Sequence, residues 1–213
     1  MGHKYEYITK SELKPVRVKI EKVINELQKK LKEVQITFQF HLIGSGKRTL
    51  VTRLVGENRE FDLDYNFYLQ KFDENIEPKE IRSMFIKSLN EIVIKHGFEY
   101  VSDGGRAIKL KLIDKKNKTI TYSCDFAIMY EDIETEKKFI LEHVKVSNKC
   151  VWEEEKLGRN YDDKVSNIIA NGLWIDVRRE YLNLKENNNK QDKQSFSLYY
   201  EAVNNIYNKY DWK

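Results

Sequence analysis

The chain has 213 residues, of which 40% are hydrophobic and 34% are charged, and its formal net charge is +4. This balance is typical of a soluble globular protein, and no apolar run approaches the roughly 20 residues that span a bilayer. The charge is too small to indicate a dedicated nucleic-acid binder, which usually carries a clustered basic stripe. We therefore expect a globular protein without a membrane span.

Targeting signals and metal-ligand spacings are absent from the sequence. Residues 1–6 lack the apolar core of a signal peptide, and Glu6 stands where N-myristoylation requires Ser or Thr. Cys124 and Cys150 lack the spacing of metal ligands, so we expect two reduced structural thiols. His143 has no partner at ligand spacing and is expected to be structural as well. These features predict a cytoplasmic protein.

A helix and a strand are predicted first along the chain. Apolar residues recur every three or four positions over residues 20–34, as a helix packed on a sheet requires, and Ser11 is the candidate N-cap. Residues 35–43 then alternate apolar and polar side chains, which is typical of a strand. This strand leads directly into a turn that contains Gly44 and Ser45.

The next strand-like segment presents two carboxylates together. Side chains alternate along a strand, so Asp62 and Asp64 project from one face. Close carboxylates repel each other unless a cation lies between them, and an oxygen-only pair suits Mg²⁺ or Mn²⁺. The preceding turn offers backbone N–H groups and the Ser45 hydroxyl to a phosphate, which indicates a triphosphate with a bound metal. Basic donors follow the turn: Lys47, Arg48 and Arg53.

The turn is not a P-loop. That motif requires G-x-x-x-x-G-K-[ST], whereas His41 stands five positions before Gly46, and Arg48 follows Lys47. For Lys47 and Arg48, contact with phosphate and ordinary surface charge are equally good interpretations.

The middle of the chain predicts a second helix followed by strands. Pro78 is typical of a helix start and Gly97 of a helix end. Three strands follow, at residues 98–102, 108–113 and 119–129, and a turn at residues 114–118 makes the last two a hairpin. Apolar side chains form one face of the last strand, and Asp125 lies on the opposite face.

Two adjacent glycines interrupt these strands and permit a tight loop. A plain turn is one interpretation of this loop. In the other interpretation, Arg106 contacts a bound triphosphate and Asp103 is a further polar contact. Lys109 and Lys111, on the strand that follows, are interpreted as a solvated face.

The Gly-Ser turn at residues 44–45, the Asp-x-Asp strand at residues 62–64 and Asp125 together resemble the nucleotidyltransferase superfamily that shares the DNA polymerase β catalytic fold. In that family a strand ends in a Gly-Ser turn, a short helix follows, the next strand carries Asp-x-Asp, and a later strand supplies a third acidic residue. The stretch before the doublet is longer here than in compact members: residues 50–55 could extend the short helix, and residues 56–59 are predicted to be a loop. The resemblance implies an α+β fold, with a mixed β-sheet nucleotidyltransferase core flanked by helices and a C-terminal helical extension.

The resemblance also implies a chemistry. Asp62, Asp64 and Asp125 would hold two Mg²⁺ or Mn²⁺ ions, while Gly44 and Ser45 grip the phosphates of an NTP. A nucleoside monophosphate would pass to an acceptor hydroxyl or similar nucleophile, with release of pyrophosphate. The acceptor stays open among an RNA end, a second nucleotide, a protein side chain and a small molecule. Further NTP contacts are expected from Lys47, Arg48 and Arg106.

Two other functions stay open. A catalytically silent member of the same fold would bind a nucleotide or a partner protein without turnover, although such a site has no need of three carboxylates. A pyrophosphokinase or alarmone synthetase has a related fold and would release AMP in place of pyrophosphate. The Asp-x-Asp doublet suits nucleotidyl transfer better.

The last third of the chain has a helical pattern. One apolar stripe runs through residues 165–182, a polar linker follows at residues 186–193, and Ser195 could cap a final helix. We therefore expect a nucleotidyltransferase core at residues 1–146 and a helical region at residues 147–213, packed on or beside the core, where acceptor choice resides. The oligomeric state stays open.

Overall fold

The computed structural model describes residues 4–56, 61–114, 119–155, 161–188, 193–210 and 212. The chain forms two compact units. The sheet unit comprises Ile8–Val51 and Asn58–Glu155, and the helical unit comprises Met1–Tyr7, Thr52–Glu57 and Lys156–Lys213. This grouping differs from the expected division after residue 146, because both ends of the chain join the helical unit and residues 147–155 join the sheet unit.

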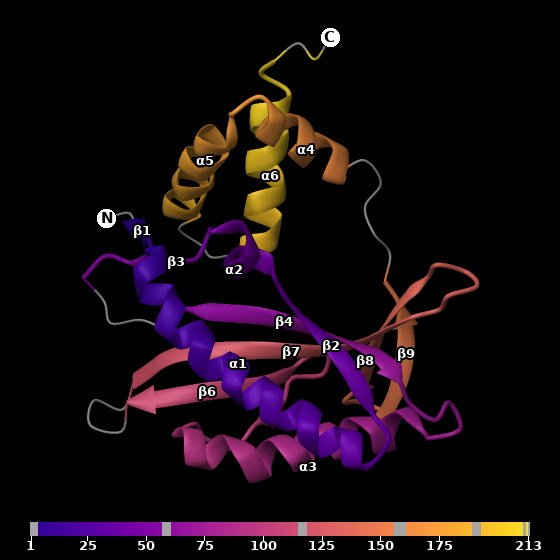
Figure 1. Ribbon diagram of the computed structural model, residues 1–213. Coiled ribbons are helices and arrows are strands. Elements are labelled where there is room, and N and C mark those ends of the chain that lie inside the picture. The colour runs from indigo at the N-terminus through magenta and orange to yellow at the C-terminus, as the bar shows by residue number, and fades with distance from the viewer. Residues whose placement is uncertain are drawn as a thin grey trace. The chain divides into compact units, whose positions relative to one another are not determined.

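A mixed sheet of seven strands organises the sheet unit within the described residues (Figure 1). The strand order is β2-β4-β7-β6-β5, and β8 pairs with both β7 and β9. β4 and β7 run parallel, whereas β2 and β6 are antiparallel to their neighbours β4 and β7, so the expected mixed α+β architecture is confirmed. The strands are β2 (Thr37–Ile43), β4 (Asp62–Lys71), β5 (Ser102–Asp103), β6 (Ile108–Asp114), β7 (Thr119–Glu131), β8 (Lys138–Val144) and β9 (Lys149–Glu154).

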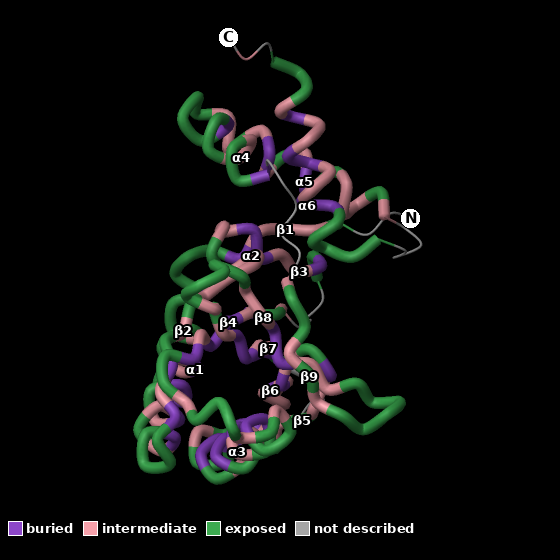
Figure 2. Tube along the Cα trace, turned by 90° about the vertical axis from the view of Figure 1, so that its right-hand side faces the viewer, coloured by how far each residue is buried: buried purple, intermediate pink, exposed green. Residues whose placement is uncertain are grey.

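Two long helices cover one face of this sheet. The apolar sides of α1 (Lys10–Glu33) and α3 (Pro78–Val93) join the strands in one hydrophobic core, which Figure 2 shows as the buried residues that face one another. Leu63, Tyr65 and Phe67 of β4 are fully buried in this core. Because neighbouring side chains of a strand point to opposite faces, Asp62 and Asp64 are left on the face that the two helices do not cover.

The helix ends follow local sequence signals. α1 begins after Thr9, whose hydroxyl accepts a hydrogen bond from the backbone N–H of Glu12 (3.2 Å), while the Glu12 carboxylate accepts one from the N–H of Thr9 (3.0 Å). This capping box makes Thr9 the cap, so the expected cap at Ser11 is wrong. The predicted start of α3 at Pro78 is confirmed, and Gly97 ends the 3₁₀ turn η1 (Ile94–His96) with φ of +76°.

Three segments differ from expectation. Residues 50–55 do not extend a helix: Thr49 adopts a left-handed conformation after α2 (Gly44–Arg48), and β3 (Thr52–Leu54) pairs with β1 (Tyr5–Tyr7). Of the strand expected at residues 98–102, only its last residue lies in a strand, β5. Residues 149–154 form β9 where a helical region was expected. Most of the loop expected at residues 56–59 and of the turn expected at residues 114–118 lies outside the described residues.

The helical unit contains α4 (Tyr161–Ala170), α5 (Trp174–Asn187) and α6 (Ser195–Tyr207). The stripe expected to form one helix is divided between α4 and α5, because Gly172 turns the chain with φ of +71°. α6 begins at Ser195, but its N-cap is Gln194. The middle of the expected polar linker, residues 189–192, lies outside the described residues. No helix in the described part of the chain is long and apolar enough to cross a membrane.

A buried ion pair ties α3 to the far edge of the sheet. The Arg82 side chain is 2% exposed, and its guanidinium donates two hydrogen bonds to the Asp103 carboxylate, at 2.6 and 3.1 Å, and a third to the Leu141 carbonyl at 2.9 Å. The same carboxylate lies 2.8 Å from Nδ1 of His143 and accepts a bond from the N–H of Gly105. His143 is therefore structural, as expected, and Asp103 holds the fold together where a substrate contact was considered.

Replacing Asp103 with Asn should lower the free energy of unfolding by about 2 kcal/mol at pH 7, because a buried guanidinium loses its charged partner. Burial alone would raise the pKa of Asp103, but the bonds from Arg82 and Gly105 outweigh it and hold this pKa below its usual value. The carboxylate therefore stabilises the fold above its unfolded pKa, and this contribution is lost as the pH falls below about 4. Urea unfolding of the parent and of Asp103→Asn at pH 7 and pH 3.5 measures how far the difference in unfolding free energy shrinks at the lower pH.

An exposed turn residue provides the control. Glu134→Gln removes one negative charge from the β7–β8 turn and should change the free energy of unfolding by less than about 0.5 kcal/mol at either pH. Equal unfolding free energies for Asp103→Asn and Glu134→Gln at pH 7 would contradict the assigned role of the buried pair.

Candidate active site

Three aspartates lie on one face of two neighbouring strands. In the parallel pairing of β4 with β7, Asp64 lies directly opposite Asp125, and Asp62 lies opposite Ser123. On β4 the residues between them point into the core, so the doublet is held on the uncovered face by burial of its neighbours. The structure therefore brings together the three carboxylates that the sequence pattern singled out.

The Gly-Ser turn reaches the same place from the other side. β2 pairs with β4 so that Ile43 lies opposite Asp64, and α2 begins at the next residue. Gly44 has φ of +58°, and a Cβ there would lie 2.6 Å from Oδ2 of Asp64. Only glycine combines this backbone conformation with so close an approach to the carboxylate.

Gly46 has a different role in the same helix. A Cβ at this position would lie 2.9 Å from Cδ1 of Leu42 and 3.0 Å from Cδ2 of Leu63. The glycine thus lets α2 pack directly against the sheet. Ser45 and the exposed Lys47 lie on this short helix, and Arg48 is its last residue.

Two further arginines that were considered as phosphate contacts lie outside α2. Arg106 is exposed in the loop between β5 and β6, at the edge of the sheet, with two strands between β5 and β4. Arg53 belongs to the helical unit, where its Nε donates to the carboxylate of Glu6 at 2.6 Å. The contacts of Lys47, Arg48 and Arg106 with an NTP stay predictions.

Two polar contacts at the aspartates were missed in the sequence. The Ser123 hydroxyl donates a hydrogen bond to the Asp62 carboxylate, and Nζ of Lys109 lies 3.3 Å from Oδ2 of Asp125. β6 and β7 are antiparallel, and their register sets Lys109 directly opposite Asp125. Counting residues outward from the predicted turn at residues 114–118 would have set Lys109 opposite Ser123, because the strands pair already at Asp114 and Thr119 and the register shifts between Leu112 and Ile113. The charge pattern alone indicated only a solvated face.

The electrostatics of the site centre on Asp64. Burial and the charges of Asp125 and Asp62 raise the pKa of Asp64 to about 6, although Lys109 opposes the shift. Like charges held close together disfavour ionisation, and a bound cation would favour it. The site therefore has the electrostatic character of a cation-binding carboxylate cluster.

The donor set fits a hard divalent cation. Carboxylate oxygens from adjacent strands are the ligands that Mg²⁺ and Mn²⁺ prefer. The absence of a side chain at Gly44 lets the Asp64 carboxylate lie close against the start of α2. Among the described residues, no three acidic, histidine or cysteine side chains converge into a formed metal centre. Within the candidate site, Asp62 is bonded to Ser123 and Asp125 is paired with Lys109.

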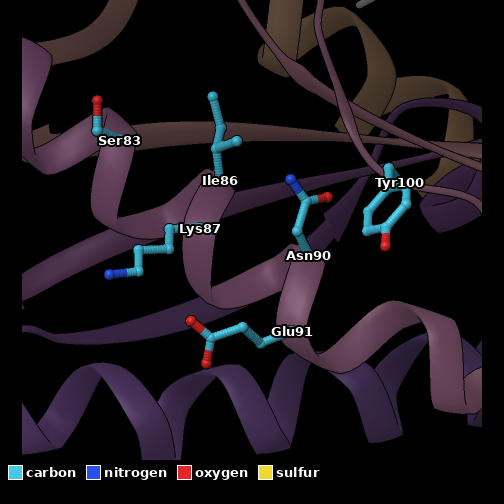
Figure 3. A pocket seen from close by; sticks show the side chains of 6 residues that line it. All are labelled: Ser83, Ile86, Lys87, Asn90, Glu91 and Tyr100. Atoms are coloured by element: carbon cyan, nitrogen blue, oxygen red, sulfur yellow. The ribbon is translucent and has the colours of Figure 1, made fainter.

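A surface hollow of about 650 Å³ lies away from this site. Five of its lining residues come from α3, which packs on the opposite face of the sheet from the aspartates (Figure 3). The amide of Asn90 in its wall is already engaged, because Oδ1 accepts a hydrogen bond from the N–H of Val101 at 2.9 Å. The hollow therefore adds no group to the carboxylate cluster. The lining residues are Ser83, Ile86, Lys87, Asn90, Glu91 and Tyr100.

Comparison with known proteins identifies the fold. No known protein family and no curated protein matches the sequence. Among solved structures, the chain is similar to DncV of Vibrio cholerae, described as a cyclic AMP-GMP synthase and a prokaryotic cGAS homolog, with a TM-score of 0.57, 15% identity, and coverage of 84% of this chain and 47% of DncV.

Nucleotide-bound forms of DncV match equally well. The form bound to 3′-deoxy GTP has a TM-score of 0.57, with 16% identity over 84% of this chain and 46% of DncV. The form bound to 3′-deoxy ATP has a TM-score of 0.58, with 14% identity over 97% of this chain and 54% of DncV. The chain therefore has the α+β nucleotidyltransferase fold and spans about half the length of DncV.

The close approach of Gly44 to Asp64 can be tested by adding one methyl group. In Gly44→Ala the new Cβ should push the Asp64 carboxylate toward solvent, so its pKa should fall from about 6 toward the usual value for aspartate. The left-handed conformation should also lower the free energy of unfolding by about 1–2 kcal/mol. Carboxyl-carbon NMR titration follows the pKa of Asp64 directly.

Gly56→Ala is the matched control. Gly56 has φ of +78°, but a Cβ there meets no atom within 4 Å, so this variant shares the backbone strain without the clash. Its unfolding free energy should fall by a similar amount, while Asp64 keeps its raised pKa. If the pKa of Asp64 stayed at about 6 in Gly44→Ala, the position of the carboxylate would not depend on the glycine.

Proposed function

We propose that this chain is a metal-dependent nucleotidyltransferase, which moves a nucleoside monophosphate from an NTP to an acceptor hydroxyl or similar nucleophile. The observation that carries the proposal is the register of β4 with β7, which sets Asp64 opposite Asp125, with Asp62 on the same face and Gly44 against Asp64. The nucleotidyltransferase fold supports this choice among the chemistries open to three carboxylates.

Asp62, Asp64 and Asp125 are the residues that would hold Mg²⁺ or Mn²⁺, with two ions expected. When bound, the ions would neutralise the triphosphate and stabilise charge on the attacking and leaving oxygens. Catalysis at such a site depends on positioning and on charge neutralisation. No histidine is required.

Other residues of the chain would bind the phosphates and accept the proton. Gly44 and Ser45 at the start of α2 would contact the β and γ phosphates, with Lys47 and Arg48 as further cationic contacts. The acceptor oxygen would form a bond to the α-phosphorus, while the bond from that phosphorus to the bridging oxygen breaks and pyrophosphate leaves with the electron pair. Asp125 is the proposed base that takes the acceptor proton.

A nucleotide hydroxyl is the acceptor to test first. DncV is described as a cyclic AMP-GMP synthase, and its fold is shared by this chain. The chain spans about half of DncV, so an RNA end, a protein side chain and a small molecule are tested beside nucleotides. The surface hollow on α3 has no assigned part in this reaction.

Removal of the Asp-x-Asp doublet should abolish transfer. The protein is incubated with each α-³²P-labelled NTP, with ATP and GTP together, and with RNA or a small-molecule extract, in Mg²⁺ or Mn²⁺. We expect labelled product and pyrophosphate from the parent, and at least about 100-fold less from Asp62→Ala/Asp64→Ala, because metal ions contribute several kcal/mol to such reactions. Glu131→Ala/Glu134→Ala, which removes two exposed charges, should match the parent.

The products separate the alternatives. Metal-dependent NTP binding without labelled product from any acceptor would favour a silent nucleotide-binding member of the fold. Release of AMP would indicate a pyrophosphokinase or alarmone synthetase. Equal product from the parent and the doublet variant would refute the assigned site.

A further inference from the structure

Lys109 forms an ion pair with one of the candidate catalytic carboxylates. It lies on β6, opposite Asp125 on β7, and its Nζ is 3.3 Å from Oδ2 of Asp125. The Lys109 side chain is 45% exposed and that of Asp125 is 29% exposed, so the pair is partly open to solvent. The charge pattern of the sequence indicated only a solvated face at Lys109, and the proposed reaction does not use this lysine.

The backbone at Gly104 lies close to the aliphatic part of the Lys109 side chain. A Cβ at Gly104 would lie 2.7 Å from Cε of Lys109 and 3.2 Å from Cδ. The N–H of Gly104 donates to the carbonyl of Ala107 at 2.9 Å, which closes the β5–β6 loop over the aliphatic part of the side chain. The loop therefore guides the ammonium group toward the strand that carries Asp125.

The ion pair between Lys109 and Asp125 is weak enough for a bound cation to displace it. Asp62, Asp64 and Asp125 place three carboxylates on one face, and a single ammonium charge partly offsets their repulsion. A partly exposed ion pair is worth only about 0.2–1 kcal/mol. Such a contact can hold Asp125 while no ion is bound and can be displaced by a divalent cation, which has twice the charge.

We propose that Lys109 is a positioning residue that occupies Asp125 before ion binding and competes with the divalent cation for its carboxylate. This inference rests on the proposed function, because it takes Asp125 as an ion ligand. Binding of the cation releases the ammonium group from Asp125. Affinity for the ion is therefore set partly by the chain's own lysine.

Direct Mn²⁺ binding to the full chain, without nucleotide, tests the proposal. The free Mn²⁺ signal in electron paramagnetic resonance gives the dissociation constant at fixed ionic strength. Lys109→Met should bind Mn²⁺ about two- to fivefold more tightly than the parent, because the competing ion pair is gone. Lys109→Arg, which keeps the charge, should stay near the parent. Lys109→Gln repeats the test if the methionine variant does not fold, as judged by circular dichroism.

Lys111→Met is the matched control for general electrostatics. Lys111 lies two residues further along the same face of β6, opposite Ser123, and carries the same charge. Its removal should change Mn²⁺ affinity less than removal of Lys109. In an Asp125→Asn background, Lys109→Met should produce no further tightening, because the competing contact is already lost.

The outcomes separate this inference from the proposed function. Equal tightening in Lys109→Met and Lys111→Met, weaker binding in Lys109→Met, or tightening that persists with Asp125→Asn would overturn the competition while leaving the metal site in place. Unchanged Mn²⁺ binding in Asp62→Ala/Asp64→Ala, or no Mn²⁺ binding by the parent, would overturn both.

Discussion

The parallel pairing of β4 with β7 is the constraint on which the candidate site depends. It sets Asp64 against Asp125, although the two residues are far apart in sequence. Leu63 and Phe67 from β4, and Phe126 from β7, are fully buried under α1 and α3. Full burial of each such side chain contributes roughly 1.5–3 kcal/mol, so the core on one face holds together carboxylates that repel each other on the other face.

The site contains the local conflicts that a stability-driven sequence would avoid. Asp64 is partly buried beside two like charges, and both the burial and the charges raise its pKa. Contacts from Ser123 and Lys109 reduce the repulsion without removing it. Conflicts of this kind concentrate at functional sites, where the surrounding fold supplies the compensating stability.

Sequence periodicity predicted what depends on local geometry. Alternation placed Asp62 and Asp64 on one face, and Pro78 marked the start of α3. Features that depend on contacts between distant segments were missed or misassigned. The pairing of Lys109 with Asp125 requires the β6–β7 register. Contact of Asp103 with a ligand stayed open beside a plain turn, because its buried partner Arg82 lies on another element. Local patterns carry no information about such partners.

The buried ion pair and the candidate site are connected through one loop. Asp103 is held by Arg82 from α3, and the next residue, Gly104, contacts the stem of Lys109. On the other side of the loop, the carbonyl of Gly105 accepts a hydrogen bond from the N–H of His143 at 3.1 Å. Because the loop is anchored at both points, the lysine that it guides toward Asp125 is positioned by the core itself. The β5–β6 loop thus influences the electrostatics of the three aspartates through Lys109, although the loop itself does not contact their carboxylates.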